Sequence, residues 1–301
     1  MIQPRKFQHY VQLAWWLLWH ERLSLLIATG LCVVSLPVND TLTGILLPKD
    51  LVHVLGILLA FFLGFRYSQA YNRWWEARIL WGALVNESRN WRDALTALLP
   101  RATPTRLHTR LLQLEVLLIW CVNASLRRAE DEAVQIPAAV QELARCLGSA
   151  QPAVQPLLQQ LARSQRELVA EDWLTPIDRR ELVRVQQQLT NAIGGLERIA
   201  NQPLPASSTF CMRALTWGYG YLVFLKLDAI GELSAAVVGW FAFLTLLMAE
   251  RIGTFLENPF RDQRFALPLD RLCRLITSDL LGAQHPLARE PIQRHHGPVI
   301  T

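Results

Sequence analysis

The sequence predicts an all-α integral membrane protein that combines four transmembrane helices with a large cytoplasmic helical region. Hydrophobic residues make up 51% of the 301 residues and charged residues only 18%, below the roughly 25% of a typical soluble chain. The apolar residues gather in two separated pairs of stretches, and no run shows the two-residue period of a strand. A mean hydropathy of only +0.19 indicates that part of the chain lies in water.

Residues 1–22 are expected to form an amphipathic helix at the membrane interface, because their tryptophans favour the headgroup level. Transmembrane helices 1 and 2 are expected within residues 23–66, and helices 3 and 4 within residues 214–252. Each apolar stretch is shorter than the roughly 20 residues of a lone spanning helix, so each could also be a buried core helix. Their arrangement in two close pairs favours the membrane.

Basic residues indicate how these helices are oriented. The segment from Arg66 to Arg213 holds 18 of the 30 basic residues, whereas the connector 39–50 holds one and the connector 228–232 holds none. Cytoplasmic segments carry the excess of Lys and Arg. We therefore expect a multi-pass protein in which both termini, the middle region 67–213 and the C-terminal tail 253–301 lie in the cytoplasm.

The middle region is expected to be helical throughout. One face with a 3.6-residue period comprises Trp81, Leu84, Val85, Ser88, Trp91, Leu95, Leu98 and Leu99. The apolar stretch 106–126 could be a fifth span, but its polar side chains and flanking arginines favour a helix buried beneath the membrane. Two further helices are expected at about 153–171 and 178–201, where Gly194-Gly195 marks either a bend or a close packing contact.

Several classes of function are not supported by the residues. No phosphate-binding glycine loop, zinc-protease motif or nucleophile elbow occurs, so we expect no enzyme and no cofactor. The five cysteines lack a Cys-x-x-Cys pair and the seven histidines form no ligand pattern, which argues against a metal site. The arginines are spread along the chain rather than gathered in a stripe with aromatic residues, which argues against nucleic acid as a partner.

The second apolar stretch carries two adjacent stripes. Gly56, Ala60 and Gly64 repeat every four residues, a pattern of small residues that lets membrane helices approach closely. One position further on, Ile57, Phe61 and Phe65 form a bulky apolar stripe, about 100° round the same helix. Such a stripe usually faces lipid or a neighbouring helix. In a symmetric oligomer with this helix at the axis, it would instead form an apolar constriction, which can gate a channel by dewetting.

Directly after this stretch come Arg66, Arg73, Trp74, Trp75 and Glu76. The arginines and the tryptophan pair could form a charged vestibule at the cytoplasmic end of the span. The alternative is anchoring at the interface, with local ion pairs such as the one between Arg73 and Glu76.

The segment GFRYSQAYNRWWEARILWG (64–82) resembles the bestrophin family of pentameric ion channels. The resemblance is supported by a second motif after the last span, Glu257, Asn258, Pro259 and Phe260, and by Leu-Pro-Leu-Asp at 267–270. The arrangement of two plus two spans around a helical cytoplasmic region is also similar, and the short C-terminal tail resembles bacterial members.

This resemblance implies a homopentameric barrel around one pore in a bacterial inner membrane. It places the hydrophobic neck of the pore at Ile57, Phe61 and Phe65, and a cytoplasmic aperture at Ile177.

One difference from the family concerns calcium, since animal bestrophins bind calcium with an acidic loop after the Asn-Pro-Phe motif. The corresponding loop here, residues 261–265, has one carboxylate between two arginines, too few for a calcium site, so calcium is an unlikely partner and Glu257–Phe260 keep a structural role.

The function expected from the residues and the resemblance is a channel for small monovalent ions. The resemblance favours anions such as chloride, whereas Asp178, Asp228 and Glu232 would favour cations if they faced the pore. The expected partners are further copies of the chain, the lipid bilayer and the permeant ions. The alternative is a non-conducting membrane scaffold or sensor whose cytoplasmic helices bind a partner.

Overall fold

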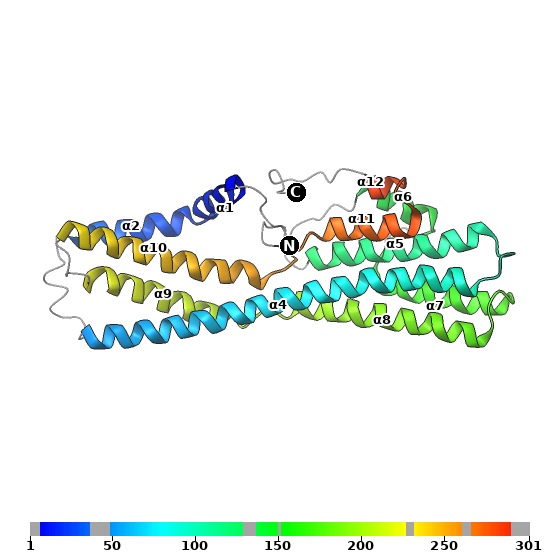
Figure 1. The fold of residues 1–301 in the computed structure, drawn as a ribbon, viewed down its shortest axis with the longest axis horizontal. Helices are drawn as coiled ribbons and strands as arrows, with labels where there is room; N and C mark the ends of the chain where they lie inside the picture. Colours follow the sequence, from blue (N-terminus) through cyan, green and yellow to red (C-terminus); the bar gives the residue numbers. More distant parts are fainter. Residues whose placement is uncertain are drawn as a thin grey trace.

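The computed structural model describes residues 7–36, 49–128, 137–149, 152–226, 232–260 and 266–289. All regular structure in these ranges is helical, which confirms the prediction of an all-helical chain. The helices are α1 (Phe7–His20), α2 (Arg22–Ser35), α4 (Lys49–Leu98), α5 (Thr105–Arg128), α6 (Ala138–Cys146), α7 (Val154–Ala170), α8 (Pro176–Asn201), α9 (Ala206–Lys226), α10 (Glu232–Glu257), α11 (Leu269–Leu281) and α12 (Pro286–Arg289). They build an elongated molecule with two halves (Figure 1).

Helix α4 runs through both halves and joins them (Figure 1). Its 50 residues correspond to a length of about 75 Å at 1.5 Å per residue. The sequence holds no proline between Lys49 and Leu99, and Pro100 follows the helix, so the hydrogen-bond ladder is not interrupted. The second apolar stretch and the periodic face beginning at Trp81 are therefore parts of one helix, although the sequence patterns describe them separately.

One half of the molecule consists of α2, the first part of α4, α9 and α10, which pack side by side (Figure 1). A small buried apolar cluster, formed by Ala28, Cys32, Phe224, Leu225, Phe243 and Leu247, holds α2, α9 and α10 together. Gly239 of α10 lies so close to α9 that a Cβ atom there would be 3.0 Å from the Cα atom of Phe224. The four helices are the ones in which the sequence predicts the spans.

Length and composition alone select a different set of candidate spans. Three helices qualify, within Val52–Leu98, Thr105–Arg127 and Ser234–Glu257, and the pair α1 and α2, bent by 71°, would be a fourth. The apolar window of α5 is 78% buried inside the chain, so we assign it to the core, in agreement with the prediction of a buried helix. Helix α9, which contains Arg213 two turns from its start and Lys226 at its end, is not in this set.

The other half contains the larger apolar core, built from α4, α5, α6, α7, α8 and α11. The predicted face of α4 is confirmed, because Trp81, Leu84 and Trp91 are fully buried in this core. The predicted helices near 153–171 and 178–201 are α7 and α8. A Cβ atom at Gly195 would lie 2.8 Å from the side chain of Leu80, whereas one at Gly194 would meet no atom within 4 Å. Gly195 therefore marks a close packing contact within a continuous helix.

Candidate functional site

The predicted neck residues form an exposed stripe on α4. Ile57 is 71% exposed, Phe61 60% and Phe65 54%, and the rings of Phe61 and Phe65 meet edge to face with their centroids 4.4 Å apart. The opposite side of the helix is buried at Val52, Leu59 and other positions against α9 and α10. The single chain thus turns one face of α4 inward and leaves the three bulky side chains largely exposed.

The stripe of small residues has two different surroundings. Gly56 packs against α9, since a Cβ atom there would lie 2.1 Å from the Oη atom of Tyr219. Ala60 and Gly64 are exposed, and a Cβ atom at Gly64 would meet no atom within 4 Å. Within the chain, close packing is therefore seen at Gly56 and not at Gly64, and packing of Gly64 against another copy of the chain stays a prediction.

Arg66, the residue after the stripe, is buried in a cluster of hydrogen bonds. Its Nε and Nη2 atoms donate to Glu257 Oε1 at 3.0 and 2.8 Å, and its Nη1 atom donates to Glu250 Oε1 at 3.2 Å. Its Nη2 atom also lies within reach of the hydroxyls of Thr209 on α9 and Thr254 on α10, at 3.4 and 3.3 Å. The expectation that Arg66 lines an open vestibule is wrong for this chain, because two carboxylates and the surrounding helices enclose its guanidinium.

A second ion pair lies on α10 beside this cluster. Arg251 Nε donates to Oε1 of Glu21 at 2.6 Å, and Glu21 is buried. Ser24 of α2 donates to the other Glu21 oxygen at 3.0 Å and accepts from Arg213 of α9 at 3.2 Å. Through these bonds the pair connects the start of α2 to α9 and α10.

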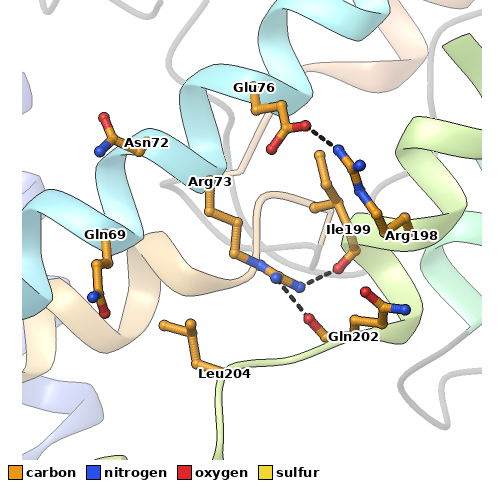
Figure 2. A pocket seen from close by; sticks show the side chains of 8 residues that line it. All are labelled: Gln69, Asn72, Arg73, Glu76, Arg198, Ile199, Gln202 and Leu204. Carbon is orange, nitrogen blue, oxygen red and sulfur yellow. Dashed lines mark hydrogen bonds and ion pairs between the residues drawn. The ribbon is translucent and has the colours of Figure 1, made fainter.

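Arg73 anchors α4 to the ends of two other helices. Its Nε atom donates to the carbonyl oxygen of Glu257 at 2.9 Å, its Nη1 atom to that of Gln202 at 2.7 Å, and its Nη2 atom to that of Ile199. Figure 2 shows the last two bonds, where the guanidinium reaches the end of α8. Because α8 ends here, its last carbonyl groups lack partners within the helix, and Arg73 satisfies two of them.

The carboxylate of Glu76 pairs with Arg198 of α8, and both side chains are about half exposed (Figure 2). Burial lowers the pKa of the Arg73 guanidinium, and the charge of Glu76 also acts on Arg73 and opposes this lowering, so the local pairing of these two residues stays a prediction. Trp74 packs against the core, whereas Trp75 is exposed and stacks against Tyr71 with ring centroids 6.3 Å apart. A cleft lies beside this region, lined by Gln69, Asn72, Arg73, Glu76, Arg198, Ile199, Gln202 and Leu204.

The two C-terminal motifs pack against each other. Phe260 is buried, and the carbonyl oxygen of Pro259 accepts a hydrogen bond from the amide of Leu267 at 2.9 Å. Asp270 accepts from Asn123 at 2.8 Å and pairs with Arg127 at 3.0 Å, which ties α11 to α5. These contacts form the junction at which Glu257, Asn258, Pro259 and Phe260 are predicted to have a structural role. The loop 261–265, for which no calcium site is expected, lies outside the described residues.

Ile177 lies in the first turn of α8, at the end of the molecule away from the first turns of α4 (Figure 1). Its side chain is 78% exposed, an unusual position for an isoleucine. Thr175 and Asp178 form a reciprocal capping box around it, in which the Asp178 amide donates to Thr175 Oγ1 at 3.1 Å. The Asp178 carboxylate is engaged in this cap through the Thr175 amide and hydroxyl.

Sequence reasoning missed the partners of Arg66. Glu250 and Glu257 lie 184 and 191 residues further along the chain, and no local pattern links them. A signal was available in the acidic residues themselves, since carboxylates at the end of an apolar helix need a cation.

Two other acidic residues considered for selectivity, Asp228 and the side chain of Glu232, lie outside what the structure describes. Within the described residues, no three His, Cys, Asp or Glu side chains are placed to hold a metal ion.

The long apolar helices, the exposed stripe on α4 and the buried ion pairs beneath it define a helical membrane protein. The family model described as "Bacterial/Fungal Bestrophin protein" matches residues 16–282. The chain belongs to this bestrophin family, as the sequence motifs predict.

Relatives and solved structures agree with this assignment. A voltage-dependent anion channel-forming protein of Ralstonia nicotianae is 31% identical over 271 residues, which cover 87% of this chain and 86% of the relative. A protein of the same name from Mesorhizobium japonicum is 34% identical over 232 residues, 74% of this chain and 71% of the relative. The crystal structure of a bacterial bestrophin homolog from Klebsiella pneumoniae matches with a TM-score of 0.75 and 26% identity, covering 87% of this chain and 98% of that one.

Proposed function

We propose that this chain forms a bestrophin-type anion channel, a homopentamer with four spans per chain in a bacterial inner membrane and with both termini in the cytoplasm. The observation that carries the proposal is the exposed stripe of Ile57, Phe61 and Phe65 on α4. The names of the relatives from Ralstonia and Mesorhizobium support anions as the permeant class. Membership of the family supports a channel rather than an enzyme.

The stripe would act as the neck of the pore. Five copies of three bulky apolar side chains around an axis offer an ion nothing to replace its hydration shell, so a narrow ring of them loses water and blocks conduction. The tight contact of Gly56 with Tyr219 on the inner side of α4 leaves the outer side for this role. Small monovalent ions would pass when the ring widens.

Ile177 would form a second constriction at the cytoplasmic end. It is highly exposed on the isolated chain, and the capping box of Thr175 and Asp178 holds the first turn of α8 in a fixed conformation. An apolar side chain on a rigid helix end suits a narrow ring of five copies. Ions would then cross a cytoplasmic cavity between the neck and this aperture.

Selectivity would not come from Arg66 or Arg73, because the first is enclosed by carboxylates and the second by backbone carbonyls. We assign it to the width of the pore and to exposed charges along its wall. The exposed pair of Glu76 and Arg198 lies about three turns beyond the neck on α4 and is the charged group that we assign to this role.

A reversal potential tests the proposal. Purified protein in a planar bilayer under a KCl gradient should carry current that reverses near the equilibrium potential of chloride. Reversal near the equilibrium potential of potassium would show that the protein is a channel that prefers cations to anions. Silence from the wild-type protein and from a variant with Ile57→Ala and Phe61→Ala, both reconstituted as intact oligomers, would favour the non-conducting scaffold or sensor.

A further inference from the structure

The guanidinium of Arg66 lies on the side of α4 opposite the bulky stripe. At about 100° per residue, its side chain leaves the helix about 180° from Ile57 and about 140° from Phe61. The two faces of α4 therefore turn together as one rigid unit. Any rotation that moves the rings of the stripe must also move Arg66 against its partners.

These partners fix the angle of the helix as well as its position. Glu250 and Glu257 lie one below the other on α10, seven residues apart, and both contact the same guanidinium. The guanidinium is planar and its donors have a fixed fork geometry, so several bonds at once leave little rotational freedom. The side chains of Arg66 and Glu250 are only 8% and 2% exposed, so water cannot readily replace a broken bond.

We propose that Arg66, Glu250 and Glu257 form a clamp that sets the rotational angle of α4 and so holds the stripe of Ile57, Phe61 and Phe65 in its closed orientation. In this role Arg66 is a positioning residue, because it acts on the neck through the helix and does not contact the ion. Opening of the pore then requires the clamp to loosen. The inference rests on the proposed channel function.

The chain supplies a matched control for this clamp. The pair of Arg251 and Glu21 is also partly buried, also joins two helices and has a bond of 2.6 Å. Its hydrogen bonds described above run to α2 and α9 rather than to α4. Replacing Glu21 by Gln should therefore lower the stability of the protein without changing the angle of α4. Replacing Glu257 by Gln should lower the stability as well, and it should also release the angle of α4.

The test compares Glu257→Gln and Glu21→Gln with the wild type in single-channel recordings, together with the thermal unfolding midpoint of each protein. We expect Glu257→Gln to raise the ratio of open to closed time roughly tenfold, which corresponds to about 1.4 kcal/mol, with an unchanged single-channel current. Glu21→Gln should lower the unfolding midpoint and leave the ratio at the wild-type value. In a Phe61→Ala background, Glu257→Gln should add nothing further, since effects on one coupled element are not additive.

A second variant keeps the test available if Glu257→Gln yields no assembled protein. Thr254→Val removes the hydroxyl that accepts a hydrogen bond from Arg66 and that itself bonds Glu250. The change keeps all charges, and it should raise the open ratio by a smaller factor. If the wild type and Phe61→Ala conduct while the clamp variants match Glu21→Gln, the clamp is structural only and the inference is wrong. If neither the wild type nor Phe61→Ala conducts, the channel function itself fails, and the inference fails with it.

Discussion

Glu115 is a fully buried carboxyl group in α5, within the core of the half that we place in the cytoplasm. Ser88 of α4 donates a hydrogen bond to its Oε1 atom at 3.0 Å, and its Oε2 atom has no hydrogen-bond partner in the described structure. Burial disfavours the charged form and raises the pKa of Glu115 from 4.5 to about 7, although the bond from Ser88 opposes this shift.

The raised pKa gives a prediction for the pH dependence of stability. Between pH 4.5 and about 7 the folded state keeps a proton that the unfolded state has lost, so stability should fall as pH rises through this window and level off above it. Replacing Glu115 by Gln should remove this dependence and stabilise the protein at pH 8 by about 3 kcal/mol. Thermal unfolding in detergent from pH 5 to 8 checks this. The exposed Glu142→Gln is the control, and an unchanged slope in Glu115→Gln would contradict the prediction.

The exposed pair of Glu76 and Arg198 leads to a prediction for selectivity. Exposed ion pairs contribute little to stability, so neutralising either residue should leave the unfolding midpoint unchanged. If the pair lies along the ion pathway, Glu76→Gln should move the reversal potential further towards chloride, and Arg198→Gln should move it towards potassium. The exposed pair of Glu142 and Arg145 on α6 is the control. Equal reversal potentials for the variants that neutralise Glu76, Arg198, Glu142 and Arg145 would mean that the pair of Glu76 and Arg198 does not lie along the ion pathway.

At the scale of elements, α4 combines two patterns that look separate in the sequence. Its apolar first part and its amphipathic second part were both predictable, because each has the helical period. Their continuity was not, since the polar residues after Phe65 could equally belong to an interfacial turn. The bonds of Arg66 and Arg73 to distant segments hold this stretch as helix, and pairing over such separations in sequence leaves no local signal.

The stripe of small residues on α4 gives a prediction about packing between helices. Gly56→Ala would place a Cβ atom against the Tyr219 hydroxyl and force that ring to move, at a cost of about 1–3 kcal/mol. Gly64→Ala meets no atom of the chain and should be neutral, or favourable by up to about 1 kcal/mol through helix propensity. Unfolding midpoints of the two variants test this difference. Equal destabilisation by both would show that Gly64 also packs closely, against a neighbouring subunit.

The remaining candidate residues show which kinds of site a sequence can reveal. The helical period gives the bulky stripe on α4, whereas Ile177 comes from the motif resemblance alone. The structure places these side chains on the surface of the chain, and their places in a pore stay predictions. The roles of Arg66 and Glu76 could not be read in the same way, because a charged residue gives no sign of which distant partner it will find. Their pairing depends on how α8 and α10 pack against α4.

At the scale of the whole molecule, the chain is elongated (Figure 1). It exposes apolar side chains along one half, including the neck stripe of α4 and several residues of α2. Such surface needs lipid or further copies of the chain to cover it. The proposal of a pentamer predicts that the detergent-solubilised protein contains five copies of the 34.3 kDa chain. Native mass measurement checks this number. A stable dimer would contradict an axial pore formed by five α4 helices.

The central claim is that the stripe on α4 lines the ion pathway, and single-channel recording of Phe61→Ala against Phe62→Ala tests it most directly. The two phenylalanines are neighbours on one helix and both are exposed, but they point about 100° apart. We predict that Phe61→Ala raises the single-channel current or the open probability, because it lowers the desolvation barrier, while Phe62→Ala behaves as the wild type. Equal behaviour of the two variants would mean that the stripe faces lipid or a neighbouring subunit and that ions cross elsewhere.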